Sequence, residues 1–410
     1  MQTIQTDTVV IGSGISGIAA AWAVAQAKRK VILVDNNPSL GGNSVNANVG
    51  TICGAYYRSL VNQRVSGNYF TKFFLDLLLQ SDALSKPMLH QDGLYIIPYQ
   101  YDSLQKIYRD LLKANQIEVV NGKMESIGIQ DKKITSLNIS LNGTQLQLLP
   151  TAIVDCSGNA SVSQLAGLET IHDANYQAAS QVFRIAQIGE TNEYALNFSI
   201  KRTILKYATE EKWPISFSSL SIIPGLLRNN SADLKLTLPD MITDKVSADE
   251  LRNRATEAIE RIMIVLKNEI ESLKHATIQS IFPQLGIRVL QRSKGQHVLT
   301  EEEVLSCSKS SEGIALGTWP IEEWGSDGRV NMGYFNLDDG YAIPAGCLIS
   351  NQVDNLFFGG KNISATSKAI ASARVMGTAW QTGYAAGKLS CAENKSIMRQ
   401  TIEELHDELL

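Results

Sequence analysis

The chain opens with short apolar runs on either side of a longer alanine-rich stretch. Residues 8–11 (Thr-Val-Val-Ile) form one β-branched run, and residues 31–34 (Val-Ile-Leu-Val) form a second. Apolar runs of about four to eight residues predict buried strands. Residues 18–28 lie between the two runs and are rich in alanine, with Trp22 and Val24 among them, which predicts a helix. The pattern therefore predicts a strand–helix–strand unit at the start of the chain.

Beyond this unit the period of polar and apolar positions changes several times. Residues 102–114 carry apolar side chains at helical spacing, and Asp102 is the expected N-cap. Residues 117–120 and 152–155 are short apolar runs, and residues 125–149 alternate as in an antiparallel meander. Strands that alternate with helices are typical of an α/β fold.

Two further helices are predicted in the second half of the chain. Residues 247–250 (Ser-Ala-Asp-Glu) form a capping box, and the residues that follow place an apolar stripe on one face over 251–273. Residues 355–358 predict a strand that enters a glycine turn, and a helix rich in glycine and alanine is expected from Ala373. We expect the stripe to face a core and the small residues to allow close packing of helix on sheet.

The turn between the first strand and the first helix has the spacing Gly12-x-Gly14-x-x-Gly17. The first glycine allows a tight turn, the second lets a pyrophosphate approach the backbone, and the third lets the helix pack on the sheet. The helix N-terminus offers free N–H groups and a positive dipole end to phosphates. Asp35 lies 18 residues past Gly17, close to the roughly 20 expected for an acid that binds ribose. Together these features predict a dinucleotide site.

A second glycine pair, Gly41-Gly42, distinguishes FAD from NAD as the expected dinucleotide. A pair at this place resembles the extended fingerprint of two-dinucleotide-binding flavoproteins, where it lets the chain run close to the FAD diphosphate. An ordinary turn after Pro38 is the alternative. The sequence contains no second GxGxxG unit that would supply a dedicated site for a nicotinamide nucleotide. We therefore expect FAD as the cofactor.

The composition fits a globular protein and argues against a nucleic-acid binder. The 410 residues are 44% hydrophobic and carry a formal net charge of -4, whereas nucleic-acid binders show a basic face. The 5 cysteines are far apart and have no spacing typical of a zinc site. We expect free thiols in a reducing compartment and no metal site.

The start of the chain favours a cytoplasmic protein. Residues 1–7 are polar and lack the basic region and cleavage site of a secretory signal. Residues 9–27 have almost the length of a membrane span, but the glycine fingerprint explains them better. We expect a protein that binds neither nucleic acid nor membranes.

The motifs together resemble those of the FAD-dependent oxidoreductases, a family related to the glutathione-reductase-like and fumarate-reductase-like flavoproteins. The segments that carry the resemblance are 12–17 with 41–42, 153–160, 284–301, 315–317, 343–344 and 353–387. The resemblance implies that FAD lies extended across the Rossmann sheet and that its isoalloxazine meets the start of the helix at Arg374-Val375-Met376. A helix N-terminus there would favour reduced flavin by about 1 kcal/mol.

The same resemblance implies an α/β fold, in which a Rossmann-type FAD-binding domain carries an inserted α+β substrate domain. We expect the FAD-binding domain to be discontinuous, over 1–55, 95–170 and 335–395, and the substrate domain to cover 56–94 and 171–334. The residues expected to hold FAD are Gly12, Ser13, Gly14, Ser16, Gly17, Asp35, Asn36, Gly41, Gly42, Asn43, Met124, Ser157, Gly158, Gly360, Lys361 and Met376.

Two arginines are the first candidates for binding substrate. Arg288 and Arg292 point to one face if residues 287–291 form a strand. A planar guanidinium pair suits a carboxylate or phosphate, which it binds in bidentate fashion. The alternative is that each arginine forms a structural ion pair, with Glu301 or Glu302 as the partner.

Three further residues are candidates for the chemistry, and each has a structural alternative. Cys53 follows the expected diphosphate site and is a candidate for a thiol beside the flavin, a redox partner or a covalent tether; the alternative is a small buried cysteine. His297 could move a proton near neutral pH, and Tyr341 could donate a hydrogen bond to substrate. A structural role is the alternative for both.

Three functions are compatible with these motifs. The first is a dehydrogenase or oxidase that passes a hydride from a small, anionic organic substrate to flavin N5. The second is a flavin-dependent hydroxylase, although the turn Gly359-Gly360-Lys361 lacks the Gly-Asp that aromatic hydroxylases usually carry. The third is a maturation flavoprotein that oxidises a side chain on a partner protein. A homodimer and a protein substrate both stay open.

Overall fold

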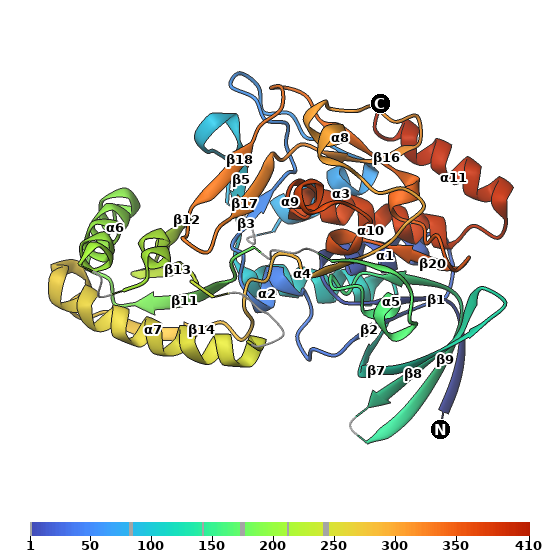
Figure 1. Ribbon diagram of the computed structural model, residues 1–410, viewed down its shortest axis with the longest axis horizontal. Helices are drawn as coiled ribbons and strands as arrows, with labels where there is room; N and C mark the ends of the chain where they lie inside the picture. Colours follow the sequence, from blue (N-terminus) through green and yellow to red (C-terminus); the bar gives the residue numbers. More distant parts are fainter. Residues whose placement is uncertain (1, 82–84, 142, 173–176, 211–212, 241–245) are drawn as a thin grey trace.

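Two sheets organise the molecule, a larger one near the N-terminus and a smaller one at the opposite end of the long axis (Figure 1). The structure is a computed structural model, which describes residues 2–81, 85–141, 143–172, 177–210, 213–240 and 246–410. The architecture is mixed α/β, as the sequence predicts, with a Rossmann-type parallel core in the larger sheet. The smaller sheet and two helices form an α+β unit between two stretches of that core.

The larger sheet has seven strands in the order β6-β2-β1-β9-β8-β7, and β20 also pairs with β9. Its parallel strands are β1 (Gln2–Ile11), β2 (Val31–Asp35), β6 (Glu118–Asn121), β9 (Thr144–Asp155) and β20 (Leu356–Phe358). Strands β7 (Lys123–Gln130) and β8 (Lys133–Leu141) pair antiparallel, as do β8 and β9. The predicted meander is therefore confirmed.

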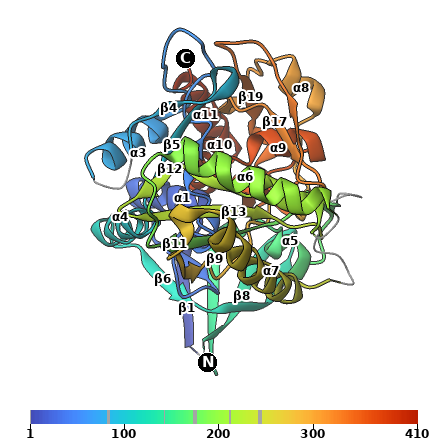
Figure 2. The same cartoon turned by 90° about the vertical axis from the view of Figure 1, so that its left-hand side faces the viewer.

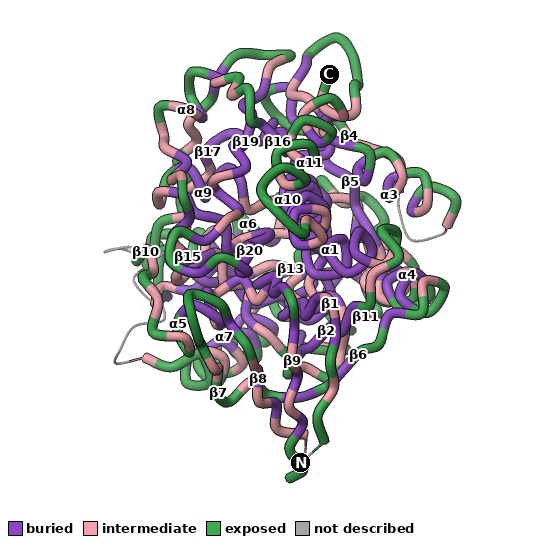
Figure 3. The backbone as a smooth tube through the Cα atoms, turned by 90° about the vertical axis from the view of Figure 1, so that its right-hand side faces the viewer, coloured by how far each residue is buried: buried purple, intermediate pink, exposed green. Residues whose placement is uncertain are grey.

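Helices α1 (Ile15–Gln26) and α10 (Met376–Ser390) pack against each other and against the larger sheet. A Cβ atom at Gly383 would lie 2.1 Å from the Ser16 carbonyl oxygen, and one at Gly387 would lie 2.4 Å from that of Ala20. Only glycine allows backbones to approach this closely, which explains the small residues of α10. Figure 3 shows both helices buried at the centre of the molecule.

Three predicted helix boundaries are corrected by the structure. Helix α4 (Tyr101–Ala114) has Gln100 as its N-cap, and Asp102 lies inside the first turn, where its Oδ1 accepts from the Ser103 N–H. Helix α1 begins at Ile15 rather than at residue 18. The helix expected from Ala373 is two helices, since α9 (Ser367–Ala373) ends before α10 starts at Met376.

The smaller sheet has the order β12-β13-β11-β14 and is covered on one face by two helices (Figure 2). Its strands are β11 (Ser180–Ala186), β12 (Ser221–Arg228), β13 (Ser231–Thr237) and β14 (Thr277–Ile281). The helices are α6 (Glu193–Thr209) and α7 (Ala248–Glu269), and the predicted Ser247 N-cap of α7 accepts from the Glu250 N–H at 3.1 Å.

Side chains alternate across the smaller sheet. Leu234 and Leu236 of β13 pack with the apolar faces of α6 and α7 in one core. The side chains of Asp233 and Lys235 therefore point to the opposite face, because successive residues of a strand face opposite sides. That opposite face looks toward the end of the larger sheet, where β1, β2 and β9 finish.

Shorter elements connect the two sheets. The helices are α2 (Asn43–Asn46), α3 (Tyr69–Leu79), α5 (Ser161–Leu165), α8 (Glu301–Leu305) and α11 (Lys395–Asp407). The strands pair as β3 (Thr51–Cys53) with β5 (Tyr95–Pro98), β4 (Met88–Leu89) with β5, β10 (Thr170–His172) with β15 (Gln291–Ser293), β16 (Gly313–Gly317) with β19 (Tyr341–Pro344), and β17 (Ile321–Trp324) with β18 (Val330–Gly333). In the described residues, we find no helix with the length and apolarity needed to cross a bilayer.

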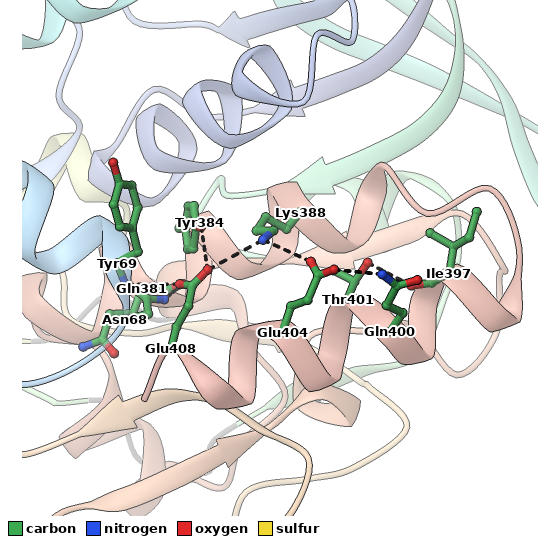
Figure 4. A network of polar contacts seen from close by, with 10 residues as sticks. All are labelled: Asn68, Tyr69, Gln381, Tyr384, Lys388, Ile397, Gln400, Thr401, Glu404 and Glu408. Carbon is green, nitrogen blue, oxygen red and sulfur yellow. Dashed lines mark hydrogen bonds and ion pairs between the residues drawn. The ribbon is translucent and has the colours of Figure 1, made fainter. Parts of the chain in front are cut away.

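Polar contacts hold the C-terminal helix α11 on α10 (Figure 4). Glu408, at the end of α11, accepts from the Tyr384 hydroxyl at 3.0 Å and from the Tyr69 N–H at 3.1 Å. The Lys388 Nζ lies 3.6 Å from a carboxylate oxygen of Glu404 and the same distance from one of Glu408. These contacts join α3, α10 and α11 at the side of the molecule away from the smaller sheet.

Candidate active site

A cavity of about 880 Å³ lies where the parallel strands of the larger sheet end. Its lining includes Ile11, Asp35 and Cys156, at or just beyond the carboxyl ends of β1, β2 and β9. Open α/β sheets bind ligands in the crevice outside these strand ends. Lys235 of β13 and Trp324 of β17 also line it, so the smaller sheet and the β17 hairpin close it from the other side. The volume is in the range of small-molecule and cofactor sites, roughly 300–1,000 Å³.

The three glycines of the first turn have different surroundings. A Cβ atom at Gly12, where φ is +95°, would lie 2.6 Å from the Cys156 carbonyl oxygen, and one at Gly17 would lie 1.8 Å from that of Gly12. A Cβ atom at Gly14 would meet nothing within 4 Å, and Gly14 lines the cavity. The fold itself therefore requires Gly12 and Gly17, whereas Gly14 leaves open space for a ligand.

The second glycine pair packs directly on this turn. Gly14 and Gly41 form a parallel bridge, and the Gly41 N–H donates to the Ser13 carbonyl at 2.9 Å. Gly42 has a φ of +51°, and a Cβ atom there would lie 3.0 Å from the Cα atom of Gly14. Helix α1 starts at this point, and its N-cap, Gly14, offers no side-chain hydrogen bond to the first turn. Exposed backbone N–H groups and a glycine cradle are what a diphosphate needs.

Asp35 connects the end of β2 to the glycine turn. Its Oδ2 accepts from the backbone N–H and from the hydroxyl of Ser13, both at 2.6 Å, and its Oδ1 accepts from the Asn37 N–H at 2.8 Å. Asp35 lines the cavity but Ser13 does not. The Oδ1 atom also accepts from the Asn37 side-chain amide at 3.1 Å. Each carboxylate oxygen has about two lone pairs, so a ribose hydroxyl would take the place of one of these four donors, such as that amide.

A second helix N-terminus meets the cavity at its other end. Val375 and Met376, the N-cap and first residue of α10, both line it, and Val375 supplies no capping side chain. A Cβ atom at Gly377 would lie 2.3 Å from the Gly54 carbonyl oxygen, so α10 starts directly against the chain that follows β3. The partial positive charge of this terminus faces into the cavity.

Most of the residues expected to hold FAD line this one cavity. Those that line it are Gly12, Gly14, Ser16, Asp35, Asn36, Gly41, Gly42, Asn43, Met124, Ser157, Gly158, Lys361 and Met376. Ser13, Gly17 and Gly360 lie behind it, and a Cβ atom at Gly360 would lie 2.5 Å from the Ser16 hydroxyl oxygen. These three support the turns rather than the cavity wall. The residues present thus fit an extended dinucleotide.

Glu322 carries the negative charge at the α10 end of the cavity. Its Oε2 accepts from the Trp319 indole N–H at 2.8 Å, and its Oε1 accepts from that of Trp324 at 2.7 Å. Burial raises the pKa of Glu322, but Arg374 and the two indole donors outweigh burial, so its pKa lies below the usual value. The side chain is therefore a carboxylate at neutral pH, held in one orientation.

Three cations surround this carboxylate. Arg288 lies over the Trp324 ring at 4.7 Å from its centroid and donates to the Ala178 carbonyl. Arg374, which follows α9, donates to the Glu322 carbonyl oxygen at 2.8 Å. Burial lowers the pKa of Arg288, and the like charge of Arg374 lowers it further. Arginine stays charged at neutral pH all the same.

Lys235 is the third cation, and it comes from the cavity face of β13. Its Nζ lies 4.5 Å from the centroid of the Trp324 ring. Burial, and then the like charge of Arg288, lower its pKa to about 8. Among the described residues, no carboxylate lies within ion-pair distance of Lys235, Arg288 or Arg374. Within the part of the chain that the structure describes, these three cations thus surround the one carboxylate of Glu322, and Lys361, whose pKa is lowered by burial and also by Arg374, adds a fourth cation to the same cavity.

The structure separates the two arginines that the sequence places together. Residues 287–290 are not a strand, and β15 covers only Gln291–Ser293, so the prediction of a shared face is wrong. Arg288 lines the cavity, whereas Arg292 is fully buried and its Nε donates to the Ala365 carbonyl at 2.8 Å. The expected ion pairs with Glu301 or Glu302 are also absent for Arg288 among the described residues.

Tyr341 and His297 lie outside the cavity, which contradicts their proposed contact with substrate. Tyr341 is buried in β19, and its hydroxyl lies 2.7 Å from that of Ser372. The Nε2 of His297 lies 2.8 Å from Glu303, whose other oxygen accepts from the Thr300 N–H in the capping box of α8. Both side chains have structural partners, which agrees with the alternative of a structural role for each.

Cys53 lines the cavity, at the end of β3. Burial raises the pKa of its thiol to about 12, and the nearby Glu322 carboxylate adds to the effect. The thiol is therefore protonated at neutral pH. A protonated thiol is a poor nucleophile, which argues against a ready covalent bond to a ligand.

The sequence pattern does not single out Lys235, Glu322 or Trp324, and it predicts Arg374 only as the start of a helix. One signal was present in β13, where Asp233 and Lys235 alternate with leucines and alanine. Two charges on one face of a strand whose other face is apolar indicate a polar surface above the strand. The sequence does not show that this surface is a cavity wall.

The comparison with known families identifies the family of the chain. The sequence model of the family described as "FAD dependent oxidoreductase" matches residues 7–409. The chain belongs to the FAD-dependent oxidoreductase family. FAD is thus the cofactor of the family, and the expected resemblance is confirmed.

Curated relatives of this FAD-dependent oxidoreductase are distant. It is 27% identical over 279 residues to the soluble pyridine nucleotide transhydrogenase of Ectopseudomonas mendocina, which covers 67% of this chain and 55% of that protein. The chain therefore spans about half the length of that relative. It is 36% identical over 84 residues to a fumarate reductase of Schizosaccharomyces pombe, which covers 20% of this chain and 16% of the relative.

Solved structures share the fold at low identity. A geranylgeranyl bacteriochlorophyll reductase-like protein of Thermoplasma acidophilum is 13% identical, with a TM-score of 0.50 over 99% of this chain and 83% of its own. The flavin-dependent brominase Bmp2 is 11% identical, with a TM-score of 0.50 over 98% of this chain and 83% of its own. The OxyS anhydrotetracycline hydroxylase of Streptomyces rimosus is 9% identical, with the same score over 98% of this chain and 66% of its own. These similarities support the flavoprotein fold alone.

Proposed function

We propose that this FAD-dependent oxidoreductase oxidises a small organic anion, which binds at the α10 end of the cavity and gives up a hydride. The observation that carries the proposal is the set of three cations without an ion-pair partner, Lys235, Arg288 and Arg374, around the single carboxylate of Glu322. Charges taken out of water are costly unless they are paired. An anionic ligand would supply the missing partner.

The cofactor half of the cavity has its own set of residues. The α1 N-terminus and Gly14 would hold the diphosphate, Asp35 would accept from a ribose, and Val375 with Met376 would contact the isoalloxazine. When bound, FAD supplies a two-electron acceptor for a hydride. Arg374 directly precedes Val375 in the chain, and Lys235 and Arg288 line the same cavity, which supports an anion site next to the expected place of the ring.

Each charged side chain has a distinct task in this proposal. Arg288 binds the carboxylate of the substrate, since its guanidinium is held by the Ala178 carbonyl and the Trp324 ring and keeps further N–H donors. Arg374 adds positive charge from the junction of α9 and α10. The carboxylate of Glu322, fixed by two indoles, offsets part of the positive charge, and its backbone carbonyl accepts from Arg374. Such fixed groups orient a substrate before it reacts.

Hydride transfer is favoured over hydroxylation on one sequence feature. The turn that follows β20 is Gly359-Gly360-Lys361, without the Gly-Asp usual in aromatic hydroxylases. Lys361 points into the cavity, and its Nζ donates to the Ile287 carbonyl at 3.0 Å. A lysine there adds positive charge beside the cofactor, which suits an anionic substrate and an anionic diphosphate.

The test is anion binding to the FAD-loaded protein. Titration with acetate, followed by the visible difference spectrum of the flavin, is expected to show saturable binding that weakens with salt. The Arg288→Met variant is expected to bind acetate about tenfold or more weakly, because a charge-assisted hydrogen bond contributes roughly 1.5–3 kcal/mol. Arg329→Met is the matched control, since Arg329 is exposed and does not line the cavity. Unchanged acetate affinity in Arg288→Met would contradict the proposed anion site.

A further inference from the structure

Lys235 differs from the other charged residues of the cavity in what surrounds its charge. Arg288 and Arg374 donate hydrogen bonds to protein carbonyls, and Glu322 accepts two indole bonds. The Lys235 ammonium has no hydrogen-bond acceptor among the described residues, and its neighbour is the face of Trp324. A lysine whose polar end meets only a ring and a cavity has its hydrogen-bonding capacity free for a ligand.

The position of Lys235 follows from the fold and is not that of an incidental surface lysine. It lies in the middle of β13, paired with Val182 of β11 on one side and with Ser221 of β12 on the other. Its two neighbours in sequence, Leu234 and Leu236, are buried in the core under α6 and α7. The strand therefore directs Lys235 away from that core and into the cavity.

We propose that Lys235 is the acid–base residue of this site, which exchanges a proton with the anion that Arg288 binds. The inference rests on the proposed function, because it needs an anionic substrate at the α10 end of the cavity. It adds a substrate class, which is a small carboxylic acid with a hydroxyl or amino group on the carbon that is oxidised. The carboxylate would meet Arg288 and the hydroxyl or amino group would meet the Lys235 Nζ.

The proton and electron balance of the step is complete with the cofactor of the family as the oxidant. The C–H bond of the substrate breaks, and its electron pair leaves with the hydrogen to FAD, which is reduced. The O–H or N–H bond on the same carbon's heteroatom breaks, and its electron pair forms the C=O or C=N bond. The released proton goes to the neutral amine of Lys235, which becomes an ammonium.

Lysine suits this role and arginine does not. A guanidinium keeps its proton at any physiological pH, whereas a buried lysine can titrate near neutrality. Burial and Arg288 together lower the pKa of Lys235 to about 8, so both protonation forms are populated in the neutral range. Asp233, the other charge on this face of β13, is paired with Arg184 at 2.5 Å and is not available as a partner.

Other titrating groups near Lys235 can be separated from it. Cys53 of β3 has a pKa raised to about 12 by burial, and His90 has a pKa lowered by burial from 6.5, so both titrate outside the range of interest. Glu322 of β17 has a lowered pKa and is ionised throughout. Lys361 also lines the cavity, and burial followed by Arg374 lowers its pKa to about 8. It therefore needs its own control variant.

The experiment measures proton-linked binding of acetate to the FAD-loaded protein, which needs no knowledge of the substrate. Acetate titrations between about pH 6.5 and 9.5 are followed by the flavin difference spectrum. In the wild type, affinity is expected to be highest at low pH and to weaken about tenfold or more by pH 9.5, because the Lys235 ammonium is lost above its pKa. Lys235→Arg is expected to change less than about twofold over the range, since it keeps the charge at every pH.

Two further variants complete the set. Lys235→Met is expected to bind acetate about tenfold more weakly at pH 6.5 and to lose the pH dependence. Lys361→Arg is expected to keep the pH dependence of the wild type. The reverse pattern, a dependence kept in Lys235→Met and lost in Lys361→Arg, would overturn the inference. Acetate binding that needs Arg288 but is independent of pH would overturn it too, while the proposed function would stand.

A second readout does not involve acetate affinity. Acetylation of Lys235 by acetic anhydride, quantified by mass spectrometry as a function of pH, reports its amine fraction directly. Half-maximal reactivity is expected near pH 8 and at least about half a pH unit higher when acetate is present, because a bound anion favours the ammonium. Reactivity that rises only near the ordinary lysine pKa of about 10.4 would overturn the inference.

Discussion

Trp324 donates its indole N–H to Glu322 at 2.7 Å, while the face of the same ring lies against Lys235 and Arg288. One side chain thus fixes the anion of the cluster and contacts two of its cations. The indole hydrogen bond helps to keep Glu322 ionised and in one orientation. The carboxylate of Glu322 therefore lowers the net positive charge that an incoming anion meets. Removing the charge of Glu322 by substitution is therefore the first test.

We predict that Glu322→Gln binds acetate more tightly than the wild type, by about fivefold or more. The substitution removes the only negative charge that lines this end of the cavity among the described residues, and unit charges several ångströms apart at a half-buried site interact by about 1–2 kcal/mol. Acetate titration of the FAD-loaded protein measures the change. Glu323→Gln is the matched control, because Glu323 does not line the cavity. Weaker binding in Glu322→Gln would show that the carboxylate holds the cations in place more than it opposes the ligand.

Substitution by alanine is predicted to affect FAD binding at Gly14 and the stability of the fold at Gly17. Gly14→Ala is expected to change the unfolding free energy of the FAD-free protein by less than about 1 kcal/mol, because its Cβ meets nothing within 4 Å. It is expected to weaken FAD binding strongly, because the methyl group enters the diphosphate cradle. Gly17→Ala is expected to destabilise the fold itself by about 1–3 kcal/mol or more, because its Cβ would lie 1.8 Å from the Gly12 oxygen. Thermal unfolding and flavin titration of the apoprotein separate the two effects.

Asp35→Ala is predicted to weaken FAD binding about tenfold or more. The ribose loses a charged acceptor worth roughly 1.5–3 kcal/mol, and Ser13 loses the carboxylate that holds it at 2.6 Å. Fluorescence titration of FAD into the apoprotein gives the dissociation constant. Asp110→Ala is the control, since Asp110 lies on the exposed face of α4. An unchanged dissociation constant for Asp35→Ala would mean that the ribose lies elsewhere.

Cys53 is predicted to react slowly and to leave the flavin free. With its pKa raised to about 12 by burial, the thiolate fraction at pH 7.5 is expected to be at least about a hundredfold below that of free cysteine. Alkylation by iodoacetamide, followed by mass spectrometry, should be correspondingly slow and should still rise with pH above pH 9. The flavin should be released as FAD when the protein is denatured. Flavin that stays on the denatured chain would reverse this account of Cys53.

The sequence predicts the glycine turn and the position of Asp35 because the signals for both are local. Gly12, Gly14 and Gly17 lie within six residues, and their spacing together with the apolar runs on either side predicts a strand, a tight turn and a helix. The position of Asp35 at the end of the second strand follows from the length of the helix that lies between the two strands. The structure adds the reason for Ser13, whose hydroxyl holds Asp35, since a hydrogen bond between two loops has no sequence pattern of its own.

The charged α10 end of the cavity, where we propose that the substrate binds, could not be predicted in the same way because its residues are brought together by tertiary structure. Lys235, Arg288, Glu322 and Arg374 come from four distant segments. The two arginines that the spacing predicts to share a face are separated, because residues 287–290 are not in a strand and β15 begins only at Gln291. A period of two residues holds only within a strand, so Arg288 enters the cavity while Arg292 is buried against Ala365.

We propose above that one cavity holds FAD and a small anion side by side. The most direct test is a crystal structure of the FAD-loaded protein grown with acetate. We predict that the diphosphate lies at Gly14 and the start of α1, that the isoalloxazine contacts Val375 and Met376, and that the acetate accepts hydrogen bonds from Arg288. An isoalloxazine ring directed away from α10, or a cluster of Lys235, Arg288 and Arg374 that binds no acetate beside the ring, would contradict the account.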